Sequence, residues 1–133
     1  MPSVKPENTF IHSVHRHLSP STYHEKMNNP YHGGTPDVWY SGNAGDLWVE
    51  YKFLPRVPQR SIVVANLSEL QKDWLERRHE EGRTVAVIVG CPSGGIILRD
   101  PEEWTATFTA VEYNNRLLDR KQIAAWIAQT TTR

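Results

Sequence analysis

Asp37, Glu50 and Lys52 stand out in residues 33–52, GGTPDVWYSGNAGDLWVEYK, a stretch rich in residues that favour β-strands. Side chains alternate between the two faces of a strand, so Glu50 and Lys52 share one face of the strand predicted over residues 47–53. Asp37 lies at the start of the preceding predicted strand and can approach this face where the two strands pair or diverge. The spacing therefore predicts two carboxylates and an ammonium group gathered over one sheet.

This combination of groups suits metal-dependent hydrolysis. Two carboxylates provide the oxygen ligands that a hard divalent cation prefers, and such a cation lowers the pKa of a bound water and neutralises phosphate charge. The ammonium group of Lys52 is placed to stabilise the charge of a transition state. The alternative is a surface salt bridge, because an acid-x-Lys triplet arises by chance roughly once in a chain of this length. Asp119-Arg120-Lys121 also matches, but there the acid is explained by N-capping a helix.

The elements that must position these groups follow from apolar periodicity and from turn-forming residues. The pattern predicts helices over 6–18, 68–81 and 119–129, strands within 21–28 and over 36–41, 47–53, 84–91 and 94–100, and turns over 42–45 and 101–104. The stretch from 105 to 118 shows no clear pattern. This order of elements predicts an α/β fold with a mixed sheet.

The length and composition of the chain narrow the class of protein. The 133 residues favour a single domain over 1–133, and the 15 basic and 15 acidic residues balance, so net charge alone does not indicate a nucleic-acid binder. The single cysteine, Cys91, excludes an internal disulfide and a zinc cage of thiolates within one chain. With no apolar segment typical of a signal peptide or a membrane span, we expect a cytoplasmic protein.

The charged stretch resembles a known nuclease signature. Thr35-Pro36-Asp37, followed after twelve residues by Glu50-Tyr51-Lys52, is similar to the PD-(D/E)xK motif of the restriction-endonuclease-like nucleases. More narrowly, residues 7–90 resemble the stand-alone, phage-type VRR-NUC nucleases, through Glu7, the Gly33-Gly34 pair and Leu67-Ser68-Glu69-Leu70-Gln71 before an apolar strand. The resemblance implies a restriction-endonuclease-like α/β core with a mixed central sheet of about four to five strands, flanked by helices in the order αβββαβ, and an extra C-terminal helix.

The resemblance also implies a role for each residue of the signature. Asp37 and Glu50 would be metal ligands, joined by the backbone carbonyl of Tyr51, and Lys52 would be the catalytic lysine. The implied cofactor is Mg²⁺ or Mn²⁺.

Two further residues have a role by resemblance and a competing structural explanation. Gln71 would lie beside the site and position Lys52 or a DNA phosphate, but Ser68-x-x-Gln71 is also a capping-box pattern. Glu7 would complete the acidic cluster as a metal ligand, directly or through water, but an acid in the first turn of any helix interacts favourably with the helix dipole. The sequence leaves both explanations open.

Several residues outside the signature are candidates for contacting DNA. His32 lies in the loop before the signature, and Arg56, Gln59 and Arg60 follow it in a proline-punctuated segment. A neutral protein needs such local clusters to hold phosphates. The alternative is an ordinary polar loop.

Aromatic and histidine residues suggest two more sites, each with a simpler explanation. Trp39 and Trp48 are candidates for stacking unpaired bases, although packing under a helix explains them more simply. His12 and His15 lie one helical turn apart and suggest a zinc site, which lacks a third ligand.

The expected activity is that of a Mg²⁺- or Mn²⁺-dependent DNA endonuclease that hydrolyses phosphodiester bonds. Related small nucleases often work as homodimers on branched DNA such as Holliday junctions, so both features are expected by analogy. Two other functions stay open: a catalytically silent DNA-binding or assembly protein with the same fold, and a nuclease acting on RNA or on single-stranded ends. If the protein is phage-encoded, the expected location is the host cytoplasm.

Overall fold

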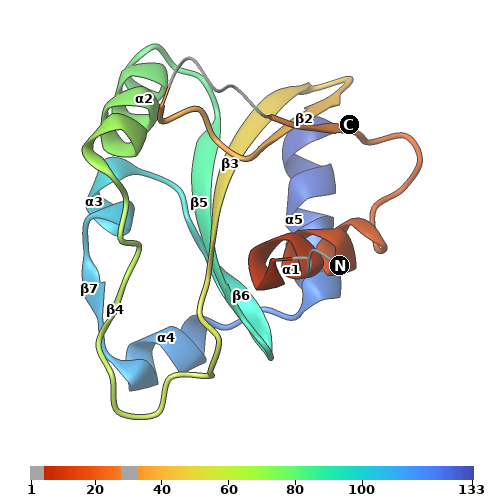
Figure 1. The fold of residues 1–133 in the computed structure, drawn as a ribbon. Coiled ribbons are helices and arrows are strands. Elements are labelled where there is room, and N and C mark those ends of the chain that lie inside the picture. The colour runs from red at the N-terminus through yellow and green to blue at the C-terminus, as the bar shows by residue number, and fades with distance from the viewer. Residues whose placement is uncertain (1–4, 28–32) are drawn as a thin grey trace.

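Five strands form a mixed sheet at the centre of the structure, a computed structural model that describes residues 5–27 and 33–133 (Figure 1). The strand order is β1-β2-β3-β5-β6. Strands β1, β2 and β3 are antiparallel neighbours, β3 and β5 are parallel, and β6 is antiparallel to β5. The five strands are β1 (Tyr23–Lys26), β2 (Val38–Gly42), β3 (Gly45–Phe53), β5 (Val85–Cys91) and β6 (Gly94–Leu98). All five strands predicted from the sequence are therefore present.

Helices cover both faces of this sheet (Figure 1). One face packs against α1 (Pro6–His15) and α5 (Arg120–Thr131). The other face packs against α2 (Glu69–Glu80), α3 (Pro101–Trp104), α4 (Ala110–Arg116) and a small sheet of β4 (Val63–Val64) and β7 (Thr107–Phe108). In the described part of the chain, no helix has the length and apolar character needed to cross a membrane.

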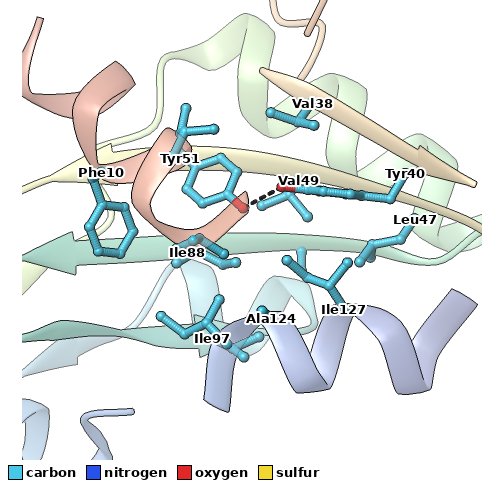
Figure 2. Packing of buried hydrophobic residues seen from close by; sticks show 14 residues of the cluster. Phe10, Val38, Tyr40, Leu47, Val49, Tyr51, Ile88, Ile97, Ala124 and Ile127 are labelled. Carbon is cyan, nitrogen blue, oxygen red and sulfur yellow. Dashed lines mark hydrogen bonds between the residues drawn. The ribbon is translucent and has the colours of Figure 1, made fainter. Parts of the chain in front are cut away.

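The core beneath α1 and α5 contains the central part of one face of β3. Leu47, Val49 and Tyr51 are fully buried there, as strand alternation predicts. The hydroxyl groups of Tyr51 and Tyr40 are 2.5 Å apart inside this core (Figure 2). His15 Nε2 lies 2.7 Å from the Tyr40 hydroxyl. The three side chains thus satisfy one another's polar atoms.

The opposite face of the sheet has a core of its own. Every residue of β5 and β6 is buried, which confirms that the apolar run is covered on both sides over 85–91; Thr84 is exposed and precedes the strand. Each nearby helix contributes one buried residue to this second core: Leu75 of α2, Trp104 of α3 and Tyr113 of α4. The sheet face that carries Glu50 and Lys52 is therefore only partly open.

The C-terminal third differs from the prediction at residues 101–104 and contains two elements that were not predicted. Residues 101–104, expected as a turn, form helix α3, because the Asp100 side chain caps their first turn. The stretch 105–118, which showed no clear pattern, contains β7 and α4. Helix α4 begins at a capping box formed by Thr109 and Glu112, a signal that the sequence does contain.

The ends of the first and last helices also differ from the prediction. Helix α1 ends at His15 and not at residue 18, because the chain continues from there in a tighter turn. Helix α5 extends to Thr131. Its predicted start is confirmed, since Asp119 and Gln122 form a capping box. Asp119 is therefore a helix cap, which explains the second acid-x-Lys triplet.

Candidate active site

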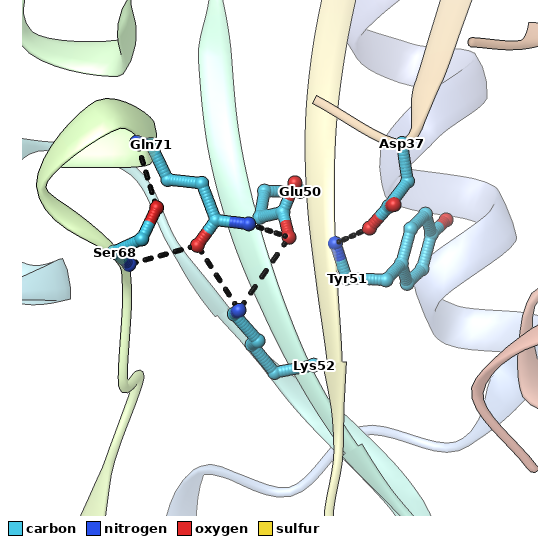
Figure 3. A network of polar contacts seen from close by, with 6 residues as sticks. All are labelled: Asp37, Glu50, Tyr51, Lys52, Ser68 and Gln71. Atoms are coloured by element: carbon cyan, nitrogen blue, oxygen red, sulfur yellow. Dashed lines mark hydrogen bonds and ion pairs between the residues drawn. The ribbon is translucent and has the colours of Figure 1, made fainter. Parts of the chain in front are cut away.

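Asp37 and Glu50 lie opposite each other at the end of the β2–β3 pairing. Val38 pairs with Val49, so the next residue pair in this register is Asp37 with Glu50. Asp37 Oδ2 accepts a hydrogen bond of 2.8 Å from the backbone N–H of Tyr51 (Figure 3). This bond fixes the Asp37 carboxylate beside the strand that carries Glu50 and Lys52.

Glu50 is the only buried Asp, Glu, Lys or Arg in residues 5–27 and 33–133, with 4% of its surface exposed. Gln71 Nε2 donates a hydrogen bond of 3.0 Å to Glu50 Oε2. The ammonium group of Lys52 lies 3.7 Å from the same oxygen. A buried carboxylate needs such partners, because leaving it unpaired is strongly destabilising.

Gln71 contributes both to the cap of α2 and to the site. Its Oε1 accepts hydrogen bonds from the backbone N–H of Ser68 at 2.9 Å and from Lys52 Nζ at 3.1 Å, while its Nε2 reaches Glu50. The Ser68 hydroxyl accepts from the Gln71 N–H to complete the capping box. Gln71 is thus both a capping-box residue of α2 and a neighbour of Glu50 and Lys52, because its amide oxygen and amide nitrogen bond to different partners (Figure 3).

The acids of the site influence one another's ionisation. Burial, and then the charge of Asp37, raises the pKa of Glu50 to about 8, although Lys52 opposes the shift. Burial also raises the pKa of Asp37 above its ordinary value, against the lowering effects of the Tyr51 N–H and of Lys52. Negative charge at this site is therefore only partly compensated by the chain itself.

The donor groups of the site fit a hard divalent cation. In a strand, the N–H and C=O of one residue point to the same side, so the Tyr51 carbonyl lies on the Asp37 side of β3. Asp37, Glu50 and this carbonyl offer oxygen atoms only, the ligands that magnesium prefers, and magnesium usually keeps several waters. Across the described ranges, no three His, Cys, Asp or Glu side chains gather closely enough to hold an ion by themselves. The set therefore fits a partly hydrated ion.

Glu7, in the first turn of α1, lies within electrostatic reach of these acids. Burial raises its pKa, and the charge of Asp37 raises it further. Lys52 and Lys26 have the opposite effect on Glu7, and Glu7 in turn raises the pKa of Glu50. The structure thus brings Glu7 to the site without a direct contact to the other acids among the described residues.

Three of the four residues expected to contact DNA lie in the described structure and make no bond to this network. Arg56, Gln59 and Arg60 are exposed in the segment after β3, which is tied to α4 by a 2.8 Å hydrogen bond from Asn114 to the Pro58 carbonyl. Within the described structure, no hydrogen bond or ion pair links the three to the site. His32 lies outside the described residues.

The histidines and tryptophans have structural surroundings of their own. His15 bonds to Tyr40, and its ring centroid is 4.0 Å from that of His24. Since no three potential ligands converge among the described residues, the zinc interpretation has no support. Trp48 packs against Trp74 of α2, with centroids 5.3 Å apart.

Sequence reasoning missed the contact of Trp74 with Trp48, the neighbour of Glu50 along the same face of β3. A signal was available, because residues three apart lie on the same face of a helix and Trp74 follows Gln71 by three. The face of α2 that carries Gln71 to Glu50 thus also carries Trp74 to Trp48.

Comparison with known proteins supports the fold. No protein-family model matches the sequence, and no curated protein does. Among solved structures, the chain is similar to that of Hjc, a Holliday junction resolvase from the archaeal hyperthermophile Archaeoglobus fulgidus. The TM-score is 0.55 at 14% identity, over 91% of this chain and 97% of that one. The expected fold class is therefore confirmed: a mixed α/β core like that of the resolvase, with helices flanking a five-stranded sheet and a C-terminal helix.

Proposed function

We propose that this chain is a divalent-metal-dependent DNA endonuclease of the PD-(D/E)xK type, working as one domain over residues 1–133. The observation that supports this most strongly is the network in which Gln71 holds both Glu50 and Lys52, with Asp37 fixed beside them. Buried acids with raised pKa values, next to a lysine in a partly open site, are typical of catalytic centres.

Asp37, Glu50 and the Tyr51 carbonyl would hold Mg²⁺ or Mn²⁺, and Glu7 would add negative charge nearby. Bound there, the cation would lower the pKa of the attacking water and neutralise charge on the phosphate. The raised pKa values of Glu50 and Asp37 support this assignment, because burial disfavours both charged carboxylates, the charge of Asp37 adds to the shift of Glu50, and a bound cation would stabilise the charged forms.

Lys52 would stabilise the charge that develops on the phosphate. An ammonium group has three N–H donors, of which one is bonded to Gln71 Oε1, while Glu50 Oε2 lies 3.7 Å away as an ion-pair partner. The Lys52 side chain is 25% exposed, so a remaining donor can reach a phosphate oxygen. Gln71 would act as a positioning residue, because it fixes both the lysine and the acid.

Branched DNA is the proposed substrate, because the fold is similar to that of a Holliday junction resolvase. His32 and the exposed Arg56, Gln59 and Arg60 would contact phosphates. A homodimer would double the basic surface that a chain of zero net charge can offer. Membership of the phage-type VRR-NUC group and a cytoplasmic location belong to the same proposal.

The test is a cleavage assay on a panel of nucleic acids. Linear duplex, supercoiled plasmid, flap, single strand, RNA and four-way junction are incubated with the protein in Mg²⁺, Mn²⁺ or EDTA. We expect metal-dependent cutting of DNA, fastest on the junction. Binding without cutting in either metal would favour the catalytically silent alternative.

A further inference from the structure

A row of aromatic rings lies directly beside the acids. Trp39 and Trp48 are opposite each other in the β2–β3 register, and each is two residues along its strand from Asp37 or Glu50. Because side chains return to the same face at every second residue, the tryptophan pair and the acid pair are successive rows on one face of the sheet. The two indole rings are stacked, with centroids 6.0 Å apart and planes at 24°.

The aromatic row extends to both sides of this pair. Trp48 meets Trp74 of α2, and the Arg78 guanidinium lies 5.7 Å from the centre of the Trp74 ring. On the other side, Tyr23 of the exposed strand β1 contacts Trp39 edge to face at 5.6 Å. All three tryptophans are partly exposed. Partly exposed aromatic rings next to cationic groups are the means by which proteins stack unpaired bases.

Trp48 also forms one wall of an open pocket of about 390 Å³, in the volume range of small-ligand sites. The other walls include Arg83 and Asp46, with Gly45 and Gly82 leaving space between them. These groups match a nucleobase: the ring stacks on Trp48, the guanidinium interacts with the base or its phosphate, and the carboxylate accepts from an exocyclic amino group.

The geometry points to a base-binding site in which Trp39 and Trp48 stack an unpaired base of the strand whose backbone lies at Glu50 and Lys52. The pocket beside Trp48 takes a base that carries an exocyclic amino group. This inference rests on the proposed nuclease function and names its substrate class: DNA with an unpaired base next to the bond to be cut. A fully paired duplex cannot use the row, because its bases stay stacked on one another.

The test compares two DNA ligands that differ only in their bases. One is a duplex with a short tail of unpaired cytidines, and the other carries the same tail with abasic residues, which keeps the charge and length. Affinities are measured by fluorescence anisotropy in EDTA, where cutting is prevented. We expect the wild-type protein to prefer the cytidine tail by about fivefold or more, and Trp39→Leu and Trp48→Leu to bring this ratio close to one.

Three further variants make this test decisive. Trp48→Phe keeps an aromatic face and retains most of the preference, and Val111→Ala, which shortens an exposed apolar side chain of α4, keeps it entirely. Asp46→Asn changes an exposed pocket residue without touching the core and lowers the preference for cytidine over thymidine tails.

The inference and the proposed function fail in distinguishable ways. An unchanged ratio in folded Trp48→Leu, or equal binding of both tails by a wild-type protein that still cuts duplex DNA, overturns the base site and leaves the nuclease proposal intact. The base site is also overturned if Trp48→Leu differs from the wild type in molar mass by light scattering while its affinity ratio for the two tails is unchanged. The aromatic row would then be an interface between protein chains. A wild-type protein that neither binds nor cuts any DNA overturns both.

Discussion

Gln71 Nε2 lies 3.0 Å from Glu50 Oε2, so the only buried acid in the described chain is held by the same amide that closes the capping box of α2. The first turn of α2 is therefore coupled to the site. Any change that loosens this turn alters the position of Glu50, and with it that of Lys52.

Replacing Gln71 by alanine should reduce both stability and cleavage. The loss of the capping-box bond costs about 1 kcal/mol of unfolding free energy, and the loss of the bonds to Glu50 and Lys52 reduces cleavage about 10- to 100-fold. Gln122→Ala is a matched control, because it breaks the equivalent capping box of α5 far from the site. Urea denaturation and cleavage rates are measured for both; equal cleavage by the two variants would contradict the coupling.

Lys52→Ala should lower the cleavage rate by about 10²- to 10³-fold, the usual effect of removing one donor that stabilises transition-state charge. The control is Lys121→Ala, which removes the lysine of the other acid-x-Lys triplet, on the exposed surface of α5. Single-turnover rates in saturating Mg²⁺ separate this effect from DNA binding. Similar rates for the two variants would remove Lys52 from the mechanism.

Metal binding should stabilise the folded protein through Glu50. A ligand present at a hundred times its dissociation constant adds about 2.7 kcal/mol to the unfolding free energy. We expect Mn²⁺ to raise the melting temperature of the wild-type protein in differential scanning fluorimetry. Glu50→Gln should lose this shift, and Glu102→Gln, which changes an exposed acid of α3, should keep it. A shift that survives in Glu50→Gln would place the metal elsewhere.

Acid should destabilise the protein through His15. Burial, and then the neighbouring His24 and His12 rings, lowers the pKa of His15 from 6.5 to about 3. Below pH 6.5 the unfolded chain binds a proton that the folded ring does not, so stability falls as the pH drops from 6.5 towards 3. The ring is only partly buried, and solvent screening limits the loss to about 1 kcal/mol between pH 7 and pH 5.

Urea titrations at pH 7 and pH 5 measure this effect. His15→Gln removes the titrating ring and should flatten the pH dependence, while the exposed control His17→Gln should not. The same pH dependence in the wild type and in His15→Gln would show that other groups cause it.

Local patterns predicted the parts of the fold that depend on local physics. Alternation along residues 47–53 assigned Glu50 and Lys52 to one face, because a strand has a period of two whatever surrounds it. The capping pattern at Ser68 and Gln71 predicted the start of α2 for the same reason. Local patterns did not predict where the start of that helix docks, because its contact with Glu50 joins residues 21 positions apart. Only the resemblance to known nucleases implied that Gln71 lies beside the site.

The features that the sequence did not reveal depend on tertiary pairing. Strand β7 has only two residues and exists because Phe108 pairs with Val63, far earlier in the chain. The burial of Glu50 likewise follows from the docking of α2 and not from any property of β3. Such contacts carry no local signal that periodicity detects.

The most direct test of the nuclease proposal is the single-turnover cleavage of a four-way DNA junction by wild-type and Glu50→Gln protein, side by side in Mg²⁺. Glu50→Gln replaces one carboxylate oxygen by an amide NH2 group and keeps the size of the side chain, so circular dichroism should show both proteins folded. We predict product from the wild type and none from the variant. Undiminished cutting by Glu50→Gln would contradict the proposed mechanism.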